Sequence, residues 1–346
     1  MELRPLGESG LNVSTVALGC YAMGGRKWGD DIRDEDSIEA IRVAVDRGVN
    51  LLDTAASYGL GHSERVVGQA VKGLREKVVL ASKIMVGFQD EDEVRMSLEG
   101  SLRSLDVDCI DLYQIHVPNR GDMAANLRVL EQMEEFRSEG KIGAIGVSNF
   151  STEQLDQGRR VAKIVSVQPP YNVLWRHIEQ DLLPYCQQHE IGVIVYSPLG
   201  QGILTGKYTA GITFAEGDAR LPNFLFHSKN FDDSLAVVDV ARQIGEARGK
   251  TTAQVAVRWV LQQNGVTAAL VGAKRPSQVE DNLGSDGWEL SADELRQLNE
   301  ISQEVHDRRP TDTPFNLMIW ENVANPFEEP IRNQIRKDYL EARVEP

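Results

Sequence analysis

The strongest constraint on the fold is an alternation, repeated eight times, between short apolar runs and longer amphipathic segments. The apolar runs are rich in β-branched residues, which is typical of strands buried on both faces. They are STVALGC (14–20), NLLDTA (50–55), KVVLASKI (77–84), CIDLYQIH (109–116), IGAIGVS (142–148), IVSVQPP (164–170), IGVIVYSPL (191–199) and VTAALVGA (266–273). The segments between them place apolar residues at helical spacing. These predicted helices cover 35–48, 62–74, 90–105, 122–139, 152–162, 177–189 and 252–263.

Eight strand–helix units with right-handed crossovers predict an α/β fold that closes into a (β/α)8 TIM barrel, with an open doubly wound sheet as the alternative. Because no linker-like segment or break in composition divides the chain, we expect one domain over 1–346, with its core at 14–290. Residues 1–13 predict a β-hairpin that plugs one barrel end.

Two further additions to the barrel are expected. Residues 200–233, after the seventh strand, are interpreted as a long loop, and residues 291–346 as a C-terminal helix followed by a tail. The tail is too apolar for a simple disordered segment, so we expect it to fold back over the barrel. Its large apolar residues are Phe315, Met318, Trp320 and Phe327.

The charge of the chain excludes several classes of partner. With 37 Lys+Arg against 52 Asp+Glu, the net charge is −15. A duplex nucleic-acid binder or a protein attached to an anionic membrane would need a basic face, so neither is expected. No apolar run reaches the roughly 18 residues of a membrane span, and residues 1–10 lack an apolar signal, so we expect a cytoplasmic protein. The histidines and the three cysteines show no metal-ligand spacing, so we predict no metal site.

Polar residues at the ends of the predicted strands point to the chemistry, since active groups of such barrels lie at the carboxyl ends of the strands. Asp53, Lys83 and His116 end three consecutive strands, and Tyr58 follows the first of them. A tyrosine hydroxyl has a pKa near 10. A neighbouring ammonium would lower that pKa, an aspartate would orient the ammonium, and a histidine could direct a carbonyl oxygen. The set suits proton transfer to an oxygen whose carbon gains or loses hydride.

The motifs around these residues resemble those of the aldo-keto reductase superfamily, in its bacterial branch related to general stress reductases and potassium-channel β subunits. The resemblance covers about residues 3–303. The motifs are DTAASYG (53–59) with GHSE (61–64), ASKI (81–84), DLYQIH (111–116), GVSNF (146–150), VQPPYN (167–172), YSPLGQGILTGKY (196–208) and VGAKRPSQVEDNL (271–283). No GxGxxG occurs, in agreement with a nicotinamide cofactor bound without a Rossmann fold.

The resemblance implies a role for each matching residue. Tyr58 would be the general acid/base, tuned by Lys83 and Asp53, and His116 would orient the substrate carbonyl. Nicotinamide would be held by Ser148, Asn149 and Gln168, stacked on Tyr196 and bordered by Gly19, Cys20, Tyr21 and Asp53. The pyrophosphate would lie along Ser197, Pro198, Leu199, Gly200, Gln201 and Gly202. The adenosine end would contact Gly272, Ala273, Lys274, Arg275, Gln278, Asp281 and Asn282. Apart from the resemblance, Trp28 is the expected substrate-facing aromatic residue, beside Tyr58 and His116, with an exposed loop residue as the alternative.

Two departures from the family pattern affect the expected ligands. The position that the resemblance assigns to a phosphate-binding arginine is Gln278, but Lys274 and Arg275 remain as cations for a 2′-phosphate. We therefore favour NADP(H), with NAD(H) as the alternative. The segment VPNR (117–120) after His116 also differs, so the substrate is given only as a carbonyl compound or a sugar or polyol.

The sequence supports an oxidoreductase, with a cofactor-sensing regulatory subunit as the alternative. A barrel isomerase or hydrolase is a weaker interpretation, because it would not need Tyr196 or the SNF motif. Ser148 and Asn149 could instead cap the helix that follows them. The sequence does not indicate an oligomeric state.

Overall fold

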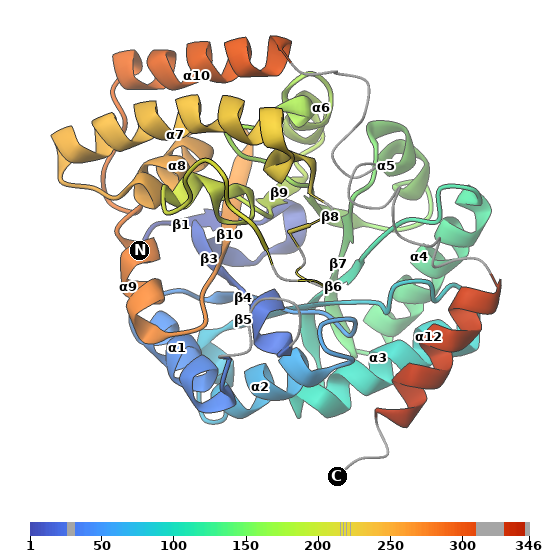
Figure 1. Cartoon of the computed structure of the whole chain (residues 1–346). Coiled ribbons are helices and arrows are strands. Elements are labelled where there is room, and N and C mark those ends of the chain that lie inside the picture. The colour runs from blue at the N-terminus through green and yellow to red at the C-terminus, as the bar shows by residue number, and fades with distance from the viewer. Residues whose placement is uncertain are drawn as a thin grey trace.

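The structure, a computed structural model, describes residues 1–25, 32–214, 216, 218, 220–221, 223–308 and 329–342. Eight parallel strands form a closed barrel in the order β10-β3-β4-β5-β6-β7-β8-β9 (Figure 1). They are β3 (Val16–Gly19), β4 (Leu51–Asp53), β5 (Val79–Lys83), β6 (Ile110–Ile115), β7 (Ile142–Ser148), β8 (Ile164–Gln168), β9 (Gly192–Val195) and β10 (Val266–Gly272). The predicted TIM barrel is confirmed.

Most strands are shorter than the apolar runs that predicted them. The run 191–199 contributes only Gly192–Val195, and the run 50–55 only Leu51–Asp53. Of the residues that follow these two strands, Thr54, Ala55 and Pro198 are buried and Tyr196, Ser197 and Leu199 are half-buried, although all of them have left the barrel ladder. Apolar content therefore marks burial, whereas hydrogen-bonded pairing decides where each strand ends.

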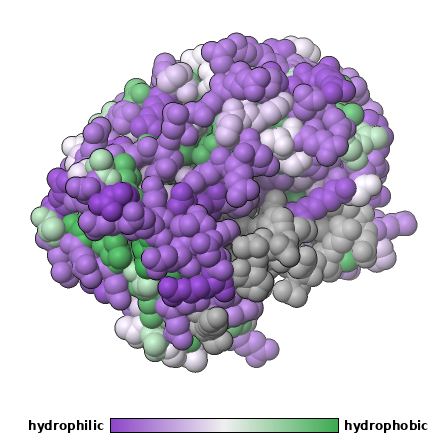
Figure 2. Space-filling view, turned by 90° about the horizontal axis from the view of Figure 1, so that it is seen from above, coloured by the Kyte–Doolittle hydropathy of each residue, from purple (hydrophilic) through white to green (hydrophobic). Residues whose placement is uncertain are grey.

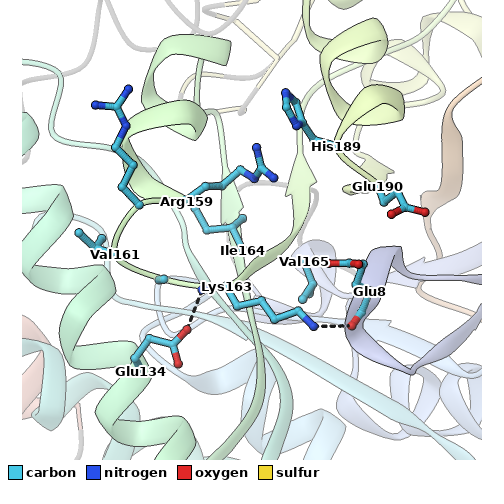
Figure 3. A pocket seen from close by; sticks show the side chains of 11 residues that line it. Glu8, Glu134, Arg159, Val161, Lys163, Ile164, Val165, His189 and Glu190 are labelled. Atoms are coloured by element: carbon cyan, nitrogen blue, oxygen red, sulfur yellow. Dashed lines mark hydrogen bonds between the residues drawn. The ribbon is translucent and has the colours of Figure 1, made fainter.

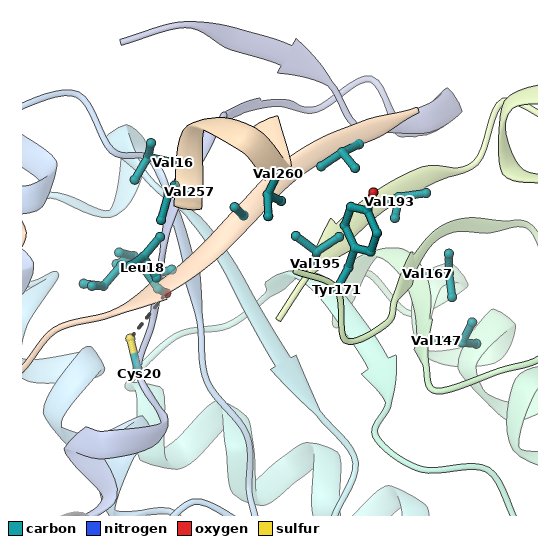
Figure 4. Close-up of a cluster of buried hydrophobic side chains, with 14 of the residues drawn as sticks. Val16, Leu18, Cys20, Val147, Val167, Tyr171, Val193, Val195, Val257 and Val260 are labelled. Carbon is teal, nitrogen blue, oxygen red and sulfur yellow. Dashed lines mark hydrogen bonds between the residues drawn. The ribbon is translucent and has the colours of Figure 1, made fainter. Parts of the chain in front are cut away.

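The helices surround the barrel. They are α1 (Asp34–Asp46), α2 (His62–Ala70), α3 (Glu91–Leu105), α4 (Met123–Ser138), α5 (Thr152–Gly158), α6 (Leu182–Gln188), α8 (Thr252–Leu261) and α9 (Pro276–Leu283). The segment predicted as one helix over 177–189 is split into the short 3-10 helix η4 (His177–Glu179) and α6. Figure 4 shows Val257 and Val260 of α8 beside Val16, Leu18 and other apolar strand residues.

The N-terminal hairpin closes the barrel at the amino ends of the strands, as predicted. Strand β1 (Leu3–Pro5) pairs antiparallel with β2 (Asn12–Ser14). Leu6 and Val13 are fully buried and pack on the inward-facing side chains of the barrel, among them Leu51 and Leu112. An apolar plug seals this end.

A long connection follows β9, as predicted, but it contains short helical turns and ends before residue 233. The 3-10 helix η5 spans Gly200–Thr205, η6 spans Phe224–Phe226, and the long helix α7 (Ser228–Arg248) begins inside the predicted loop. Helix α7 continues because Val237, Val238, Ala241 and Ile244 form a buried stripe at helical spacing. The stripe packs against α8 and α10 (Ala292–Asp307).

The C-terminal part of the chain returns to the barrel at a second place. Helix α12 (Glu329–Glu341) lies beside α3 in Figure 1, across the molecule from α7 and α10. Its Tyr339 is fully buried, stacks edge-on against Phe88 at 5.5 Å between ring centroids, and donates a hydrogen bond to the carbonyl of Ser97. Residues Phe315, Met318, Trp320 and Phe327 lie outside the described residues.

The surface is mostly hydrophilic on the face shown in Figure 2, in keeping with the net charge of −15. Among the described residues, no helix combines the length and hydropathy needed to span a membrane.

Candidate functional site

Lys83 lies at the centre of the polar groups that gather at the carboxyl ends of the strands. Its Nζ donates hydrogen bonds to Asp53 Oδ1 at 2.5 Å, to the carbonyl of Thr54 at 2.9 Å and to the Tyr58 hydroxyl at 3.2 Å. The Lys83 side chain is fully buried. A buried ammonium needs all three acceptors, so its position is fixed by β4 and the loop after it, which supply them.

The loop that carries Tyr58 is held against the short 3-10 helix η2 (Tyr21–Gly24). A Cβ atom at Gly59, whose φ is +61°, would lie 2.2 Å from the carbonyl oxygen of Gly24. A Cβ at Gly24 would in turn lie 2.9 Å from the backbone of Tyr58. The two glycines therefore allow a backbone contact that fixes the tyrosine over Lys83.

The pKa of Tyr58 is raised well above its ordinary value, chiefly by burial and then by the charge of Asp53. Lys83 was expected to lower this pKa, but burial and the charge of Asp53 outweigh any such effect. Asp53 lies 2.5 Å from the ammonium and so offsets part of its positive charge at the phenol. Tyr58 consequently holds its proton at neutral pH, which suits a proton donor.

His116 lies on the other side of Tyr58. The two rings are 5.5 Å apart between centroids at an interplanar angle of 79°. Burial, and secondly the charge of Lys83, lower the pKa of His116 well below its usual value. The ring is thus neutral at pH 7. Its Nδ1 is hydrogen-bonded to Ser57 Oγ at 3.1 Å. When Nδ1 accepts this hydrogen bond from the hydroxyl, the proton of the neutral ring is on Nε2.

Asp53 has partners that the sequence did not reveal. Its Oδ2 accepts hydrogen bonds from the side-chain amides of Gln114 at 3.2 Å and Gln168 at 2.8 Å. Gln168 was expected at the nicotinamide, but Gln114 was not singled out. The available signal was its position two residues before His116, the spacing of side chains that share one face of an extended strand.

The residues expected to hold nicotinamide form one hydrogen-bonded group. Tyr196 donates to Asn149 Oδ1 at 2.8 Å, and Asn149 Nδ2 donates to Ser148 Oγ and to the carbonyl of His116. Ser148 Oγ donates to the carbonyl of Gln168 at 2.8 Å. These residues do not cap α5, because Ser151 does so through a capping box with Gln154. Burial raises the pKa of Tyr196.

The segment expected at the pyrophosphate is a tight turn after β9. Ser197, Gly200, Gln201 and Gly202 all have positive φ, between +54° and +101°. The backbone N–H groups of Gly200 and Gly202 donate within the turn, to the carbonyls of Ser197 at 3.0 Å and Leu199 at 2.9 Å, and so keep it tight. Pro198 and Leu199 lie within this turn.

The strand end expected to border nicotinamide also lies here. Beyond Gly19, the backbone N–H of Cys20 donates to the carbonyl of Asp53 at 2.8 Å. The ring of Tyr21 is 4.8 Å from that of Tyr58. Burial raises the pKa of the Cys20 thiol, so this group is not a thiolate nucleophile at neutral pH.

The residues expected at the adenosine end surround the start of α9. The backbone N–H of Lys274 donates to Gln278 Oε1 at 2.8 Å, and Asn282 Nδ2 donates to the carbonyl of Gly272 at 3.2 Å. Asp281 instead accepts from Gln254 and Thr251 at the start of α8. The side chain of Gln278 is therefore engaged in a hydrogen bond with the backbone. Lys274 and Arg275, which follow the buried Ala273, are the cations at this helix terminus.

Trp28 lies outside the described residues. The hollow drawn in Figure 3, about 370 Å³, lies at the opposite end of the barrel, between the hairpin and the starts of β8 and β9. Its lining includes Glu8, Lys163 and His189. Lys163 is tied to Glu134 and to the carbonyl of Glu8. None of the residues described above at the carboxyl ends of the strands lines this hollow. No cluster of potential metal ligands occurs among the described residues.

Comparison with known proteins matches residues 15–303 to the aldo/keto reductase family. "Aldo-keto reductase YhdN" of Bacillus subtilis is 38% identical over 87% of this chain and 93% of its own length. The "NADH-specific methylglyoxal reductase" of Escherichia coli is 32% identical over 88% of this chain and 99% of its own length.

Two solved structures share the fold. That of the glycerol dehydrogenase AKR11B4 from Gluconobacter oxydans has a TM-score of 0.79 at 38% identity, over 90% of this chain and 98% of that one. The aldo/keto reductase from Klebsiella pneumoniae in complex with NADP and acetate has a TM-score of 0.69 at 32% identity, over 86% of this chain and 94% of that one.

Proposed function

The chain belongs to the aldo/keto reductase family, and from this premise we propose that it is a nicotinamide-dependent carbonyl reductase in which Tyr58 is the general acid. The observation that carries the proposal is the hydrogen bond from the buried Lys83 to the Tyr58 hydroxyl, with Asp53 on the far side of the ammonium. A phenol in this position can give its proton to an oxygen above it. It can take the proton back when a hydroxyl is oxidised.

The side chains divide the work of the reduction. His116, neutral because burial lowers its pKa, donates a hydrogen bond from Nε2 to the carbonyl oxygen and fixes its direction. Tyr58 transfers its hydroxyl proton to the same oxygen. Lys83 stabilises the tyrosinate that remains, and Asp53 holds Lys83 in place. The cofactor supplies the hydride when it is bound.

The residues present fit a nicotinamide cofactor. Ser148, Asn149 and Gln168 carry hydroxyl and amide groups that can pair with a carboxamide, and these three side chains are buried together. We place the pyrophosphate along the turn at 197–202, which follows β9 at the carboxyl end of the barrel. The start of α9, with Lys274 and Arg275, suits a phosphate of the adenosine part.

We favour NADP(H) over NAD(H) because of Lys274 and Arg275, since a 2′-phosphate needs a nearby cation. The Klebsiella relative was solved with NADP, whereas the Escherichia coli relative is named as NADH-specific, so the family includes both cofactors. Titration with NADPH and with NADH, followed by tryptophan fluorescence, decides between them. Stronger NADH binding would contradict the assignment of these two cations.

The substrate class that we propose is a small carbonyl compound or the corresponding sugar or polyol. The relatives named for methylglyoxal and glycerol act on small polar molecules of this kind. We also propose that the chain works as one domain in the cytoplasm. Turnover of such a compound by the purified protein would distinguish an enzyme from a cofactor-sensing regulatory subunit.

Replacing Tyr58 by Phe tests the mechanism. The variant should lose turnover by at least about 10²-fold, the typical contribution of a positioned acid, and should bind the cofactor as tightly as the wild type. Wild-type kcat in Tyr58→Phe would rule out the proposed acid.

A further inference from the structure

Gln114 is a fully buried glutamine between the acid–base group and the proposed nicotinamide site. It lies on β6, two residues after Leu112, which faces the barrel interior. Because side chains alternate along a strand, Gln114 faces inward as well. A buried amide must satisfy both its donor and its acceptor, so its neighbours show what it does.

The hydrogen bonds around Gln114 define the orientation of a second amide. The Nε2 of Gln168 donates to Asp53 Oδ2 at 2.8 Å and to Gln114 Oε1 at 3.2 Å. An amide nitrogen has two hydrogens, so both are used. Gln114 can accept in this way because its own Nε2 is held by Asp53 Oδ2 at 3.2 Å.

We propose that Gln114 is a positioning residue that turns the amide of Gln168 so that its carbonyl oxygen is offered to the amino group of the nicotinamide carboxamide. The inference rests on the proposed function, since it requires that a nicotinamide cofactor binds here. With the nitrogen of Gln168 occupied by Asp53 and Gln114, its Oε1 is the part of the amide left for a ligand.

Glutamine is the residue type that this position needs. A glutamate would put a second carboxylate beside Asp53 and would have no donor when ionised. A methionine of similar length would remove both the donor and the acceptor, leaving Gln168 with Asp53 alone. The Gln168 amide could then turn, and the acceptor for the carboxamide would no longer be fixed.

The test compares three probes on the wild type and Gln114→Met, by fluorescence or calorimetric titration. NADP⁺ carries the carboxamide, its 3-acetylpyridine analogue lacks the amino group, and 2′-phospho-ADP-ribose lacks the whole nicotinamide. Gln114→Met should bind NADP⁺ about five-fold more weakly, the effect of one hydrogen bond between neutral groups. The other two probes should bind equally to both proteins.

A matched control and a second variant keep the test sharp. Gln132 is also a buried glutamine, which donates to the carbonyl of Glu91 in another part of the molecule, so Gln132→Met should leave all three affinities unchanged.

In Gln114→Glu, the new carboxyl group would share a proton with Asp53 at low pH and so replace the amide. Its affinity for NADP⁺ should therefore approach the wild-type value near pH 5 and fall towards pH 8.

The outcomes separate the two proposals. Equal weakening of all three probes, or no weakening of NADP⁺, in Gln114→Met would overturn the positioning role. A wild-type protein that binds none of the probes would overturn the proposed function itself.

Discussion

The two ends of the barrel are closed in opposite ways. At the amino ends of the strands, the hairpin inserts Leu6 and Val13 into an apolar layer. At the carboxyl ends, the barrel contains Lys83, Asp53, Gln114 and Gln168, which are as buried as the plug but polar or charged. Apolar burial stabilises without needing a partner, whereas every buried polar group needs one. The first end therefore maintains the fold, and the second carries groups that only chemistry requires.

The largest expected effect comes from removing the buried cation. Lys83→Met should reduce kcat by at least about 10²-fold. It should also lower the free energy of unfolding by roughly 3–5 kcal/mol, because Asp53 would be left buried without its counter-ion. Steady-state kinetics and chemical denaturation measure the two effects.

A double variant separates stability from function at this end. Lys83→Met with Asp53→Leu removes both charges, so it should regain much of the lost stability while remaining inactive. Recovery of activity in the double variant would contradict the catalytic role of the ion pair.

The plug should show the reverse pattern. Leu6→Ala removes fully buried methyl groups, which should lower the free energy of unfolding by about 2–5 kcal/mol. The kcat at a temperature where the variant is folded should match that of the wild type, since the strands separate Leu6 from the site. A large fall in kcat without unfolding would show that the two ends are coupled.

The pH dependence of stability should include a contribution from the carboxyl end of the barrel that the apolar plug cannot make. The pKa of His116 is lowered on folding, so protonation favours the unfolded chain. The stability that His116 contributes is present above its unfolded pKa near 6.5 and is lost as pH falls. The pKa of Tyr58 is raised, so its contribution is present below about pH 10 and is lost above it.

Denaturation curves measured from pH 4 to pH 11 test these signs. His116→Asn should flatten the acid side of the stability profile and leave the alkaline side unchanged. An unchanged acid side in that variant would contradict the assignment to His116.

The smallest effect is expected at a helix start next to the site. Ser151 caps α5 and accepts a hydrogen bond from the backbone of Gln154. Ser151→Ala should lower the free energy of unfolding by about 1 kcal/mol and leave kcat unchanged, because the side chain of Ser151 is hydrogen-bonded to Gln154 and to none of the proposed site residues. Thermal unfolding and kinetics check both, with Ser291→Ala, which removes the equivalent cap of α10, as the control.

Much of this arrangement could be predicted from the chain alone. The alternation of apolar and amphipathic segments fixed the barrel, because strands buried on both faces and helices buried on one face have different periods. The positions of Asp53, Lys83 and His116 at strand ends followed from the same pattern. The helical stripe in α7 was missed, although Val237, Val238, Ala241 and Ile244 carry the signal for it.

Only the tertiary structure decided how the polar groups act on one another. Lys83 was expected to lower the pKa of Tyr58, but its distance from Asp53 sets how much charge the phenol experiences, and that distance depends on two separate strands. The proposed role of Gln114 likewise depends on its hydrogen bonds with Asp53 and Gln168, which are 61 and 54 residues away along the chain. Periodicity is a local property that a sequence records. Electrostatic coupling and hydrogen-bond direction depend on distances between remote residues, and folding alone establishes these.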